Sequence, residues 1–402
     1  MVIGIIGGGA SGMMAALTAA QNPQVQVILL ERQARVGRKL LATGNGRCNL
    51  TNTNLRPYHG TQPEFAQPAL EALNPVMTRA WFRSKGLYTV KEPSGRVYPY
   101  SDQANSVVDI LRLALERENI TVRTGFEVTK VRKTETGFTV TGGDETLSCD
   151  RLIVACGGLA GTKLGGSMSG YKLLAKLGHK STRLRPTLVQ LKSSWHGLAS
   201  LKGVRANCHV RVFRDDQLFA ESQGEIQFTD YGLSGPVIFE VSRDVCAESG
   251  EWTCRLDFLP AWTREDVCNE LSCRLHSPLP VQELLTGILH NRLGRVLTQA
   301  AGISMSKRCW DLTRQELENV TQTVKGFCVN IDEPMGMDHA QVTAGGVLTC
   351  DFDPHTMESH LVPGLYACGE VLDIDGDCGG YNLQWAWSSG YLAGLHAGKE
   401  IL

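Results

Sequence analysis

The stretch Val2-Ile3-Gly4-Ile5-Ile6-Gly7-Gly8-Gly9-Ala10-Ser11-Gly12 decides the fold of this chain. Residues 2–6 form an apolar run that predicts a buried strand, and residues 13–20 predict a helix. The glycines between them follow the G-x-G-x-x-G spacing, in which a tight turn brings backbone N–H groups and a helix start against a pyrophosphate. The stretch therefore predicts a dinucleotide-binding βαβ unit, whose phosphate-binding residues are Gly7, Gly9, Ala10, Ser11 and Gly12.

The second strand of this unit, residues 25–30, ends at an acidic side chain. Glu31 stands about where a carboxylate binds the ribose hydroxyls of a dinucleotide, and Arg32 follows it. A Gly-rich turn without a ligand does not require this order of strand, turn, helix, strand and acid. We therefore predict that Glu31 and Arg32 contact the cofactor.

The next segment, VGRKLLATGNGRCNLTN at residues 36–52, does not read as an ordinary crossover helix. Its glycines let the backbone pass close to a flat ring, and its asparagines can hydrogen-bond polar ring edges. Lys39 and Arg47 suit a phosphate or the pyrimidine edge of a flavin, although a basic surface loop is the alternative. Cys48 is either a packed thiol or a flavin contact. The cofactor-binding residues predicted here are Lys39, Gly44, Asn45, Gly46, Arg47, Cys48 and Asn49.

The other half of the predicted site lies near the end of the chain. Residues 364–370 read as a strand that runs into a tight turn, and Gly379-Gly380 opens a helix that continues to residue 397. A helix N-terminus aimed at the pyrimidine edge of a flavin stabilises the anion formed on reduction. Small residues at Ala386, Ser389, Gly390 and Ala393 allow this helix to pack tightly. The predicted cofactor-binding residues are Gly369, Glu370, Gly380, Tyr381, Asn382 and Leu383.

Together with VACGG (154–158), QFTDYGLSGP (227–236) and VTAGGV (342–347), these motifs resemble the BaiN-like bacterial NAD(P)/FAD-dependent oxidoreductases, the group that includes aminoacetone oxidase. The resemblance covers essentially the whole chain. It implies bound FAD, a glutathione-reductase-like Rossmann domain, and an inserted β-barrel with a small helical part. It also implies that the strand near Val128 bonds the adenine through its backbone. The turn after residues 151–155 adds Gly157 to the predicted site.

The predicted fold class is α/β, with a split Rossmann-like FAD domain and an insertion. The FAD domain occupies residues 1–187 and 341–402, because the turn motifs fall in these two segments. Alternating strands predict a β-barrel over 188–257 and 324–340. Helical spacing predicts a helical subdomain over 258–323, where Thr313 and Glu316 form a capping box.

Composition limits the class of protein. Across 402 residues the formal net charge is −1, which gives no field to attract nucleic acid or an anionic membrane. No apolar run reaches about 18 residues, so no spanning helix is expected. The 13 cysteines show no C-x-x-C or metal-ligand spacing, which predicts reduced cytoplasmic thiols and no metal site. The expected partner is a small-molecule substrate.

The expected function is that of an FAD-dependent oxidoreductase. Hydride would pass between flavin N5 and a nicotinamide or small organic substrate. No second G-x-G-x-x-G lies between residues 160 and 340, so NAD(P)H would dock only transiently. The alternatives are an oxygen-using amine oxidase and a non-catalytic flavin redox sensor. No residue stands out as a catalytic base: His196 lies near a turn, and His290 ends a helical run.

Overall fold

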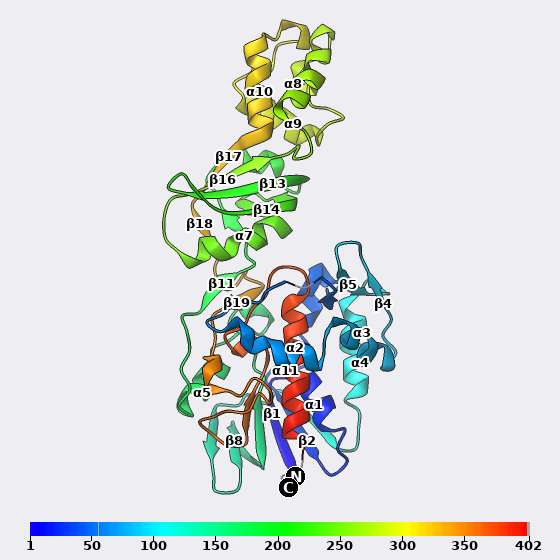
Figure 1. The fold of residues 1–402 in the computed structure, drawn as a ribbon, viewed down its shortest axis with the longest axis vertical. Helices are drawn as coiled ribbons and strands as arrows, with labels where there is room; N and C mark the ends of the chain where they lie inside the picture. The colour runs from blue at the N-terminus through cyan, green and yellow to red at the C-terminus, as the bar shows by residue number, and fades with distance from the viewer. Residues whose placement is uncertain (55, 400–402) are drawn as a thin grey trace. The chain divides into compact units, whose positions relative to one another are not determined.

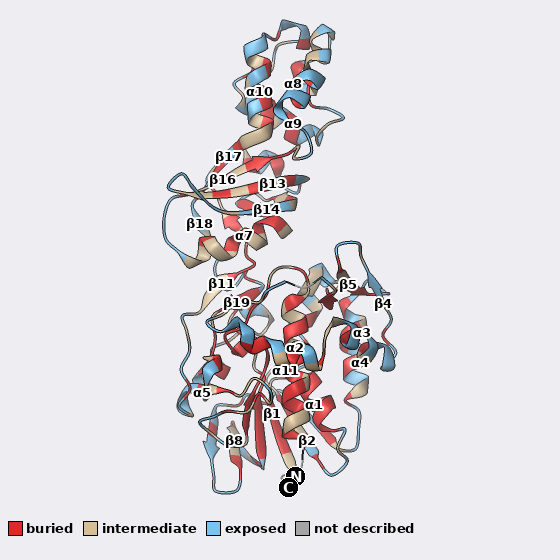
Figure 2. Cartoon of the chain, viewed as in Figure 1, coloured by how far each residue is buried: buried red, intermediate tan, exposed pale blue. Residues whose placement is uncertain are grey.

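The computed structural model describes residues 1–54 and 56–399, and the chain forms two compact units (Figure 1). Unit 1 comprises Met1–Pro186 and Ala340–Leu402, and unit 2 comprises Thr187–His339. Residues 400–402, at the end of the predicted segment 341–402, lie outside the described residues. Each unit buries its own apolar core (Figure 2). Within the described residues, no helix has the length and apolar character needed to cross a membrane.

The centre of unit 1 is a five-stranded sheet in the order β20-β10-β1-β2-β6, and all of its neighbouring strands are parallel. This sheet confirms the predicted α/β, Rossmann-like class. The parallel pairing also places the carboxyl ends of all its strands at one edge. Its strands are β1 (Val2–Ile6), β2 (Gln26–Glu31), β6 (Ile120–Thr124), β10 (Arg151–Val154) and β20 (Leu365–Ala367).

Helices α1 (Ala10–Ala19) and α11 (Tyr381–Ala397) lie side by side against this sheet (Figure 1). Their backbones approach closely because α11 has glycines at the crossing. A methyl group on Gly390 would lie 2.3 Å from Ser11 O, and one on Gly394 would lie 2.4 Å from Ala15 O. The predicted tight packing of the C-terminal helix is confirmed at Gly390, and both helices are largely buried (Figure 2).

The remaining elements of unit 1 surround this core. Among the described residues they comprise two three-stranded antiparallel sheets, one two-stranded sheet, peripheral helices and 3-10 turns. The strands are β3 (Thr51–Asn52), β4 (Thr89–Lys91), β5 (Arg96–Pro99), β7 (Lys130–Lys133), β8 (Phe138–Gly142), β9 (Glu145–Cys149), β11 (Arg185–Thr187) and β19 (Val342–Ala344). The helices are α2 (Gln67–Ala72), α3 (Pro75–Ser84), α4 (Ala104–Ala114) and α5 (Ser169–Lys176), with 3-10 turns η1 (Leu40–Gly46), η2 (Pro63–Ala66), η3 (Thr162–Leu164), η7 (Thr349–Asp351) and η8 (Gly369–Val371).

Unit 2 contains a seven-stranded sheet in the order β17-β16-β13-β14-β15-β12-β18, with antiparallel pairs. Its strands are β12 (Leu191–Lys192), β13 (Arg205–Arg214), β14 (Gln217–Phe228), β15 (Gly232–Ser234), β16 (Trp252–Asp257), β17 (Phe327–Ile331) and β18 (Glu333–Pro334). Helices α6 (Leu198–Leu201) and α7 (Pro236–Ala247) interrupt the strands, and α7 packs on β14. The alternating pattern did not predict α7, whose first turn begins at Pro236, a favoured position for proline.

The helical part of unit 2 contains α8 (Arg264–Ser272), α9 (Asn291–Ala300) and α10 (Arg314–Gly326), with 3-10 turns η4 (Cys273–His276), η5 (Val281–Glu283) and η6 (Cys309–Asp311). The predicted capping box is confirmed, because Thr313 Oγ1 accepts the Glu316 N–H and the Glu316 carboxylate accepts the Thr313 N–H. Helix α10 continues three residues past the predicted boundary at 323. The expectation that His290 ends a helix is wrong: it caps the start of α9 by accepting the Arg292 N–H.

Candidate functional site

Four strands of the parallel sheet deliver Gly-rich or acidic residues to its carboxyl edge. β1 is followed by Gly7, β2 ends at Glu31, β10 leads to Gly157, and β20 leads to Gly369. The Gly7 N–H donates to Leu30 O at 2.8 Å, which joins the turn to the second strand. Ligands of open parallel sheets bind at this edge, so the fold gathers the predicted residues where a ligand is expected.

The turn between β1 and α1 is tight on one side and open on the other. A methyl group on Gly7 would lie 2.3 Å from Ala155 O, and one on Gly12 would lie 1.8 Å from Gly7 O. A methyl group on Gly9 would meet none of the described atoms within 4 Å. The described residues also provide no side-chain cap for the first turn of α1. This open cradle of uncapped N–H groups fits a pyrophosphate.

Glu31 is held by the backbone at both carboxylate oxygens. Its Oε2 accepts the Gly8 N–H at 2.8 Å, and its Oε1 accepts the Gln33 N–H at 2.7 Å. Each oxygen retains a further lone pair, so a ribose diol can still donate to this carboxylate. The Arg32 guanidinium donates to Gly165 O at 2.6 Å. The Phe126 N–H donates to Glu31 O at 3.0 Å, so the segment that contains buried Val128 begins beside this strand end.

The two halves of the predicted site meet through an ion pair. Lys39 Nζ lies 2.8 Å from Glu370 Oε2, and Glu370 Oε1 accepts the Thr343 N–H at 2.8 Å. The loop between Lys39 and Asn49 folds as a 3-10 turn with a kink. Its residues Gly44, Asn45 and Gly46 have φ values of 57°, 56° and 84°. The N-terminal loop and the turn after β20 therefore form one site in unit 1.

Arg47 and Cys48 make other contacts in this loop. The Arg47 guanidinium bonds Asp102 and Glu92 and stacks over the Tyr98 ring at 3.9 Å. Its hydrogen bond to Asp102 outweighs partial burial and raises its pKa above the usual value. Burial raises the pKa of the Cys48 thiol to about 11, and this side chain is fully buried. The thiol therefore stays protonated near neutral pH, which favours the packing interpretation for Cys48.

The start of α11 presents an unsatisfied acceptor. Gly380 has a φ of 101°, and a methyl group there would lie 2.6 Å from the backbone of Thr51. The same position lies 3.0 Å from Asn49 Oδ1, a buried oxygen without a hydrogen-bond partner among the described residues. Asn52 Nδ2 donates to Gly379 O at 2.9 Å. A buried acceptor beside an uncapped helix start fits the polar edge of a flavin ring.

The residues that follow in α11 mainly fix this start. Tyr381 is buried and packs edge-on against Tyr58, with ring centroids 6.5 Å apart. Asn382 bonds the preceding loop, and Leu383 packs partly buried against the core. Trp385 and Trp387 are buried and donate to backbone carbonyls, so both side chains pack the helix against the core.

Comparison with known proteins identifies the family. The model of the HI0933-like protein Rossmann domain matches residues 1–396. The chain belongs to the HI0933-like family. It is 41% identical over 406 residues to the 3-dehydro-bile acid delta(4,6)-reductase of Clostridium scindens, a match that covers 99% of both chains. It is 34% identical to the ribosomal RNA dihydrouridine synthase of Escherichia coli K12, over 96% of this chain and 95% of that protein.

A solved structure supports the fold assignment. The 3-ketosteroid delta1-dehydrogenase of Sterolibacterium denitrificans, in complex with 1,4-androstadiene-3,17-dione, aligns with a TM-score of 0.50 at 12% identity. The alignment covers 98% of this chain and 99% of that one. The family model and the full-length relatives confirm the resemblance stated from the sequence motifs. As an HI0933-like protein of the BaiN-like flavoprotein group, the chain is an FAD-dependent oxidoreductase.

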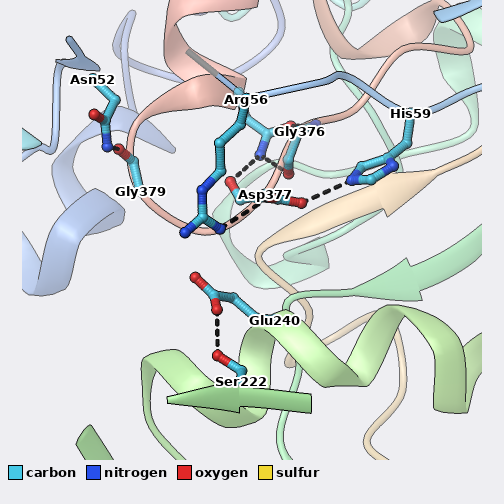
Figure 3. Close-up of polar contacts among 9 residues, drawn as sticks. Asn52, Arg56, His59, Ser222, Glu240, Gly376, Asp377 and Gly379 are labelled. Atoms are coloured by element: carbon cyan, nitrogen blue, oxygen red, sulfur yellow. Dashed lines mark hydrogen bonds and ion pairs between the residues drawn. The ribbon is translucent and has the colours of Figure 1, made fainter. Parts of the chain in front are cut away.

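Three residues of this HI0933-like chain enter the site without having been predicted in it. Asp377, in the loop before α11, contacts both Arg56 and His59 (Figure 3). Arg56 and His59 precede Asp377 by more than three hundred residues and form no local motif with it. Only the folded chain brings these three side chains together.

Proposed function

We propose that this enzyme reduces a carbon–carbon double bond conjugated to a carbonyl group in a small organic molecule, with a nicotinamide as electron donor. One observation carries the proposal: two full-length relatives, at 41% and 34% identity, have names that describe the same bond chemistry. The first name denotes reduction of double bonds at positions 4 and 6 of a 3-oxo steroid. The second denotes addition of two hydrogens to a uracil ring. In both molecules the double bond is conjugated to a carbonyl.

The site residues suit this chemistry by holding the cofactor. FAD, when bound, supplies a hydride donor and acceptor at N5. The turn at Gly9 and the Glu31 carboxylate would hold its adenine half. Asn49 and the start of α11 would orient its ring, beside the Lys39–Glu370 pair. Burial raises the pKa of Cys368 and Cys156 to about 12, which opposes thiolate chemistry in this region.

The charge supports a small substrate rather than RNA. Lysines and arginines number 40 and acidic residues 41, whereas RNA binding depends on an excess of cationic side chains at phosphates. The nicotinamide would dock transiently. The parallel, dinucleotide-type sheet lies in unit 1, and the pairs described in the seven-stranded sheet of unit 2 are antiparallel.

Anaerobic stopped-flow absorbance tests the proposal in two steps. Purified holoprotein is first mixed with NADH or NADPH, and the flavin absorbance should bleach. The reduced protein is then mixed with a 3-oxo-4,6-diene steroid acid, with uridine, or with a transcribed ribosomal RNA fragment. Reoxidation by the steroid or by another small enone supports the proposal. Reoxidation by the RNA fragment alone would replace it with RNA modification, and bleaching by an amine with peroxide release in air would replace it with amine oxidation.

A further inference from the structure

A carboxylate in the loop before α11 holds two basic side chains from the segment after β3. Asp377 Oδ1 lies 2.7 Å from His59 Nε2, and Asp377 Oδ2 lies 3.2 Å from Arg56 Nη1 (Figure 3). The side chains of His59 and Asp377 are 30% and 25% exposed. The pair is therefore sheltered from bulk water on most sides and still accessible to a ligand.

The backbone around this carboxylate is fixed from two directions. Asn382 Oδ1 accepts the Gly376 N–H at 2.9 Å, and Asn382 Nδ2 donates to Gly376 O at 2.6 Å. His59 and Asp375 exchange both backbone hydrogen bonds, at 2.8 and 3.1 Å. A side chain on a backbone held in this way has a defined position, which catalytic geometry requires.

Electrostatics keep the carboxylate ionised. Burial by itself would raise the pKa of Asp377, but the hydrogen bonds and charges of His59 and Arg56 outweigh burial and lower it. A charged acceptor at His59 Nε2 favours the ring form with a proton on that nitrogen. Nδ1 is then the ring nitrogen that takes no part in the hydrogen bond to Asp377. Among the described residues, the titratable and charged groups on the segments bonded to that of His59 include Asp377, Arg56, Asp375, Asp373 and Tyr58. Cys378 follows Asp377 in the chain, and Tyr381 packs against Tyr58.

The cluster lies next to the residues expected to orient the flavin. The loop that carries Asp377 runs directly into Gly380, which contacts Thr51 and Asn49. Asn49 provides the buried oxygen without a partner among the described residues, and Asn52 bonds the same loop at Gly379. Arg56 and His59 follow strand β3 (Thr51–Asn52) in the chain. One compact set of contacts therefore links His59 to the predicted ring end of the site.

We propose that His59 donates the proton that completes reduction of the conjugated double bond, and that Asp377 is the positioning residue that orients its ring. This inference rests on the proposed function. Reduction adds a hydride equivalent to the carbon remote from the carbonyl, with the two electrons supplied by reduced FAD. The π bond breaks, and the carbon next to the carbonyl takes the Nδ1 proton of the His59 imidazolium, which leaves the neutral ring with its proton on Nε2 beside Asp377. The neutral imidazole then regains a proton from water.

The decisive experiment separates the two half-reactions in His59→Gln and Asp377→Asn holoproteins. General acid catalysis contributes about 10²- to 10⁴-fold, so His59→Gln should slow flavin reoxidation by the enone at least about 100-fold. Flavin bleaching by the nicotinamide should change less than about twofold. The pH dependence of the reoxidation rate should lose one ionisation in His59→Gln. Asp377→Asn should slow reoxidation to a smaller extent, and Asp377→Glu should restore part of the rate.

A second readout needs neither cofactor nor turnover. In ¹⁵N-histidine spectra of the apo-protein, His59 Nε2 should stay protonated when the ring is neutral, and Asp377→Asn should remove this preference. His196→Gln, at an exposed position, is the control and should leave both half-reactions unchanged. An unchanged reoxidation rate and pH profile in a folded, FAD-loaded His59→Gln protein would overturn the inference alone. Failure of every conjugated carbonyl to reoxidise the wild-type flavin would overturn the proposed function, and the inference with it.

Discussion

The starts of helices α1 and α11 differ in how they are built. Both follow glycines, and among the described residues neither has a side-chain cap. The start of α1 is formed by neighbours in sequence, with Gly7 packed against Gly12 and Glu31 bonded to Gly8. The start of α11 lies beside the Asn49 side chain, and the loop that leads into it is bonded by Asn52 at Gly379 and by His59 at Asp377, side chains from a distant segment of the chain. The first is a local motif, and the second exists only after the chain has folded.

This difference has a chemical counterpart. A phosphate group needs only N–H donors and space, which a short glycine pattern can encode. A reacting ring needs groups placed on several sides, and residues close in sequence cannot surround it. We therefore expect substitutions near α1 to affect folding and FAD affinity, and substitutions near α11 to affect flavin reactivity.

The largest effect should come from closing the turn before α1. In Gly12→Ala the new methyl group would lie 1.8 Å from Gly7 O, and overpacking of this kind costs typically 1–3 kcal/mol or more. We expect loss of FAD and a clear fall in the unfolding temperature of the apo-protein. Gly9→Ala is the matched control, because its methyl group enters open space. Gly9→Ala should retain most of the stability of the apo-protein, but it should bind FAD poorly because the methyl group occupies the predicted phosphate cradle. Equal unfolding temperatures for the two apo-proteins would contradict the difference in packing between Gly12 and Gly9.

Glu31 tests the ribose contact at the same end of the site. Charge-assisted hydrogen bonds are worth roughly 1.5–3 kcal/mol, so Glu31→Ala should weaken FAD binding about ten- to a hundredfold. Fluorescence titration of apo-protein with FAD measures this change. Glu31→Gln keeps the shape and loses the charge, and we expect an intermediate dissociation constant. An unchanged FAD dissociation constant in Glu31→Ala would show that Glu31 does not bind the ribose.

The pH dependence of stability tests a buried group, His179, that belongs to neither helix start. His179 is buried between Asp351 and Ser359, and burial lowers its pKa, although Asp351 opposes this shift. The unfolded chain then binds the proton more readily, so stability should fall as the pH drops below about 6.5, by at most ~1.4 kcal/mol per pH unit. Thermal unfolding of the apo-protein between pH 7 and 5 measures the slope. His179→Gln should flatten it, and exposed His339→Gln should leave it unchanged; equal slopes in all three proteins would assign the effect to other groups.

The smallest effect should come from a charge at the start of α11. A charged side chain at Gly380 itself cannot test this effect, because the Cβ of Gly380→Asp would lie 2.6 Å from the backbone of Thr51. Asn49→Asp is nearly isosteric and places a negative charge beside the same helix start. Interactions at a helix terminus are worth about 0.3–2 kcal/mol, so the two-electron potential should fall by roughly 6–40 mV. Spectroelectrochemical titration at matched pH, with Asn45→Asp as the comparison, measures it. A higher potential in Asn49→Asp would mean that this helix start does not face the reducible ring.

The sequence predicted what local patterns can encode. The apolar run at residues 2–6, the glycine spacing and the acid at residue 31 predicted β1, α1 and β2, and small residues predicted the tight packing at Gly390. Helix α7 was missed because its amphipathic pattern follows directly from a strand pattern. The cluster around Asp377 was missed because an exposed-looking acid in a loop has no periodicity, and its partners lie in a distant segment. A contact between segments far apart in sequence produces no regular spacing of residues from which it could be predicted.

The contact between α1 and α11 also has a consequence for synthesis. The glycines that press on Ser11 and Ala15 belong to residues 381–397, so the nucleotide turn lacks its supporting helix until this segment has been translated. A nascent chain that ends within unit 2 contains the glycine turn before α1 but not helix α11. We therefore expect FAD to be acquired only after α11 has been translated, and ribosome-bound chains lacking α11 to expose an apolar face to chaperones.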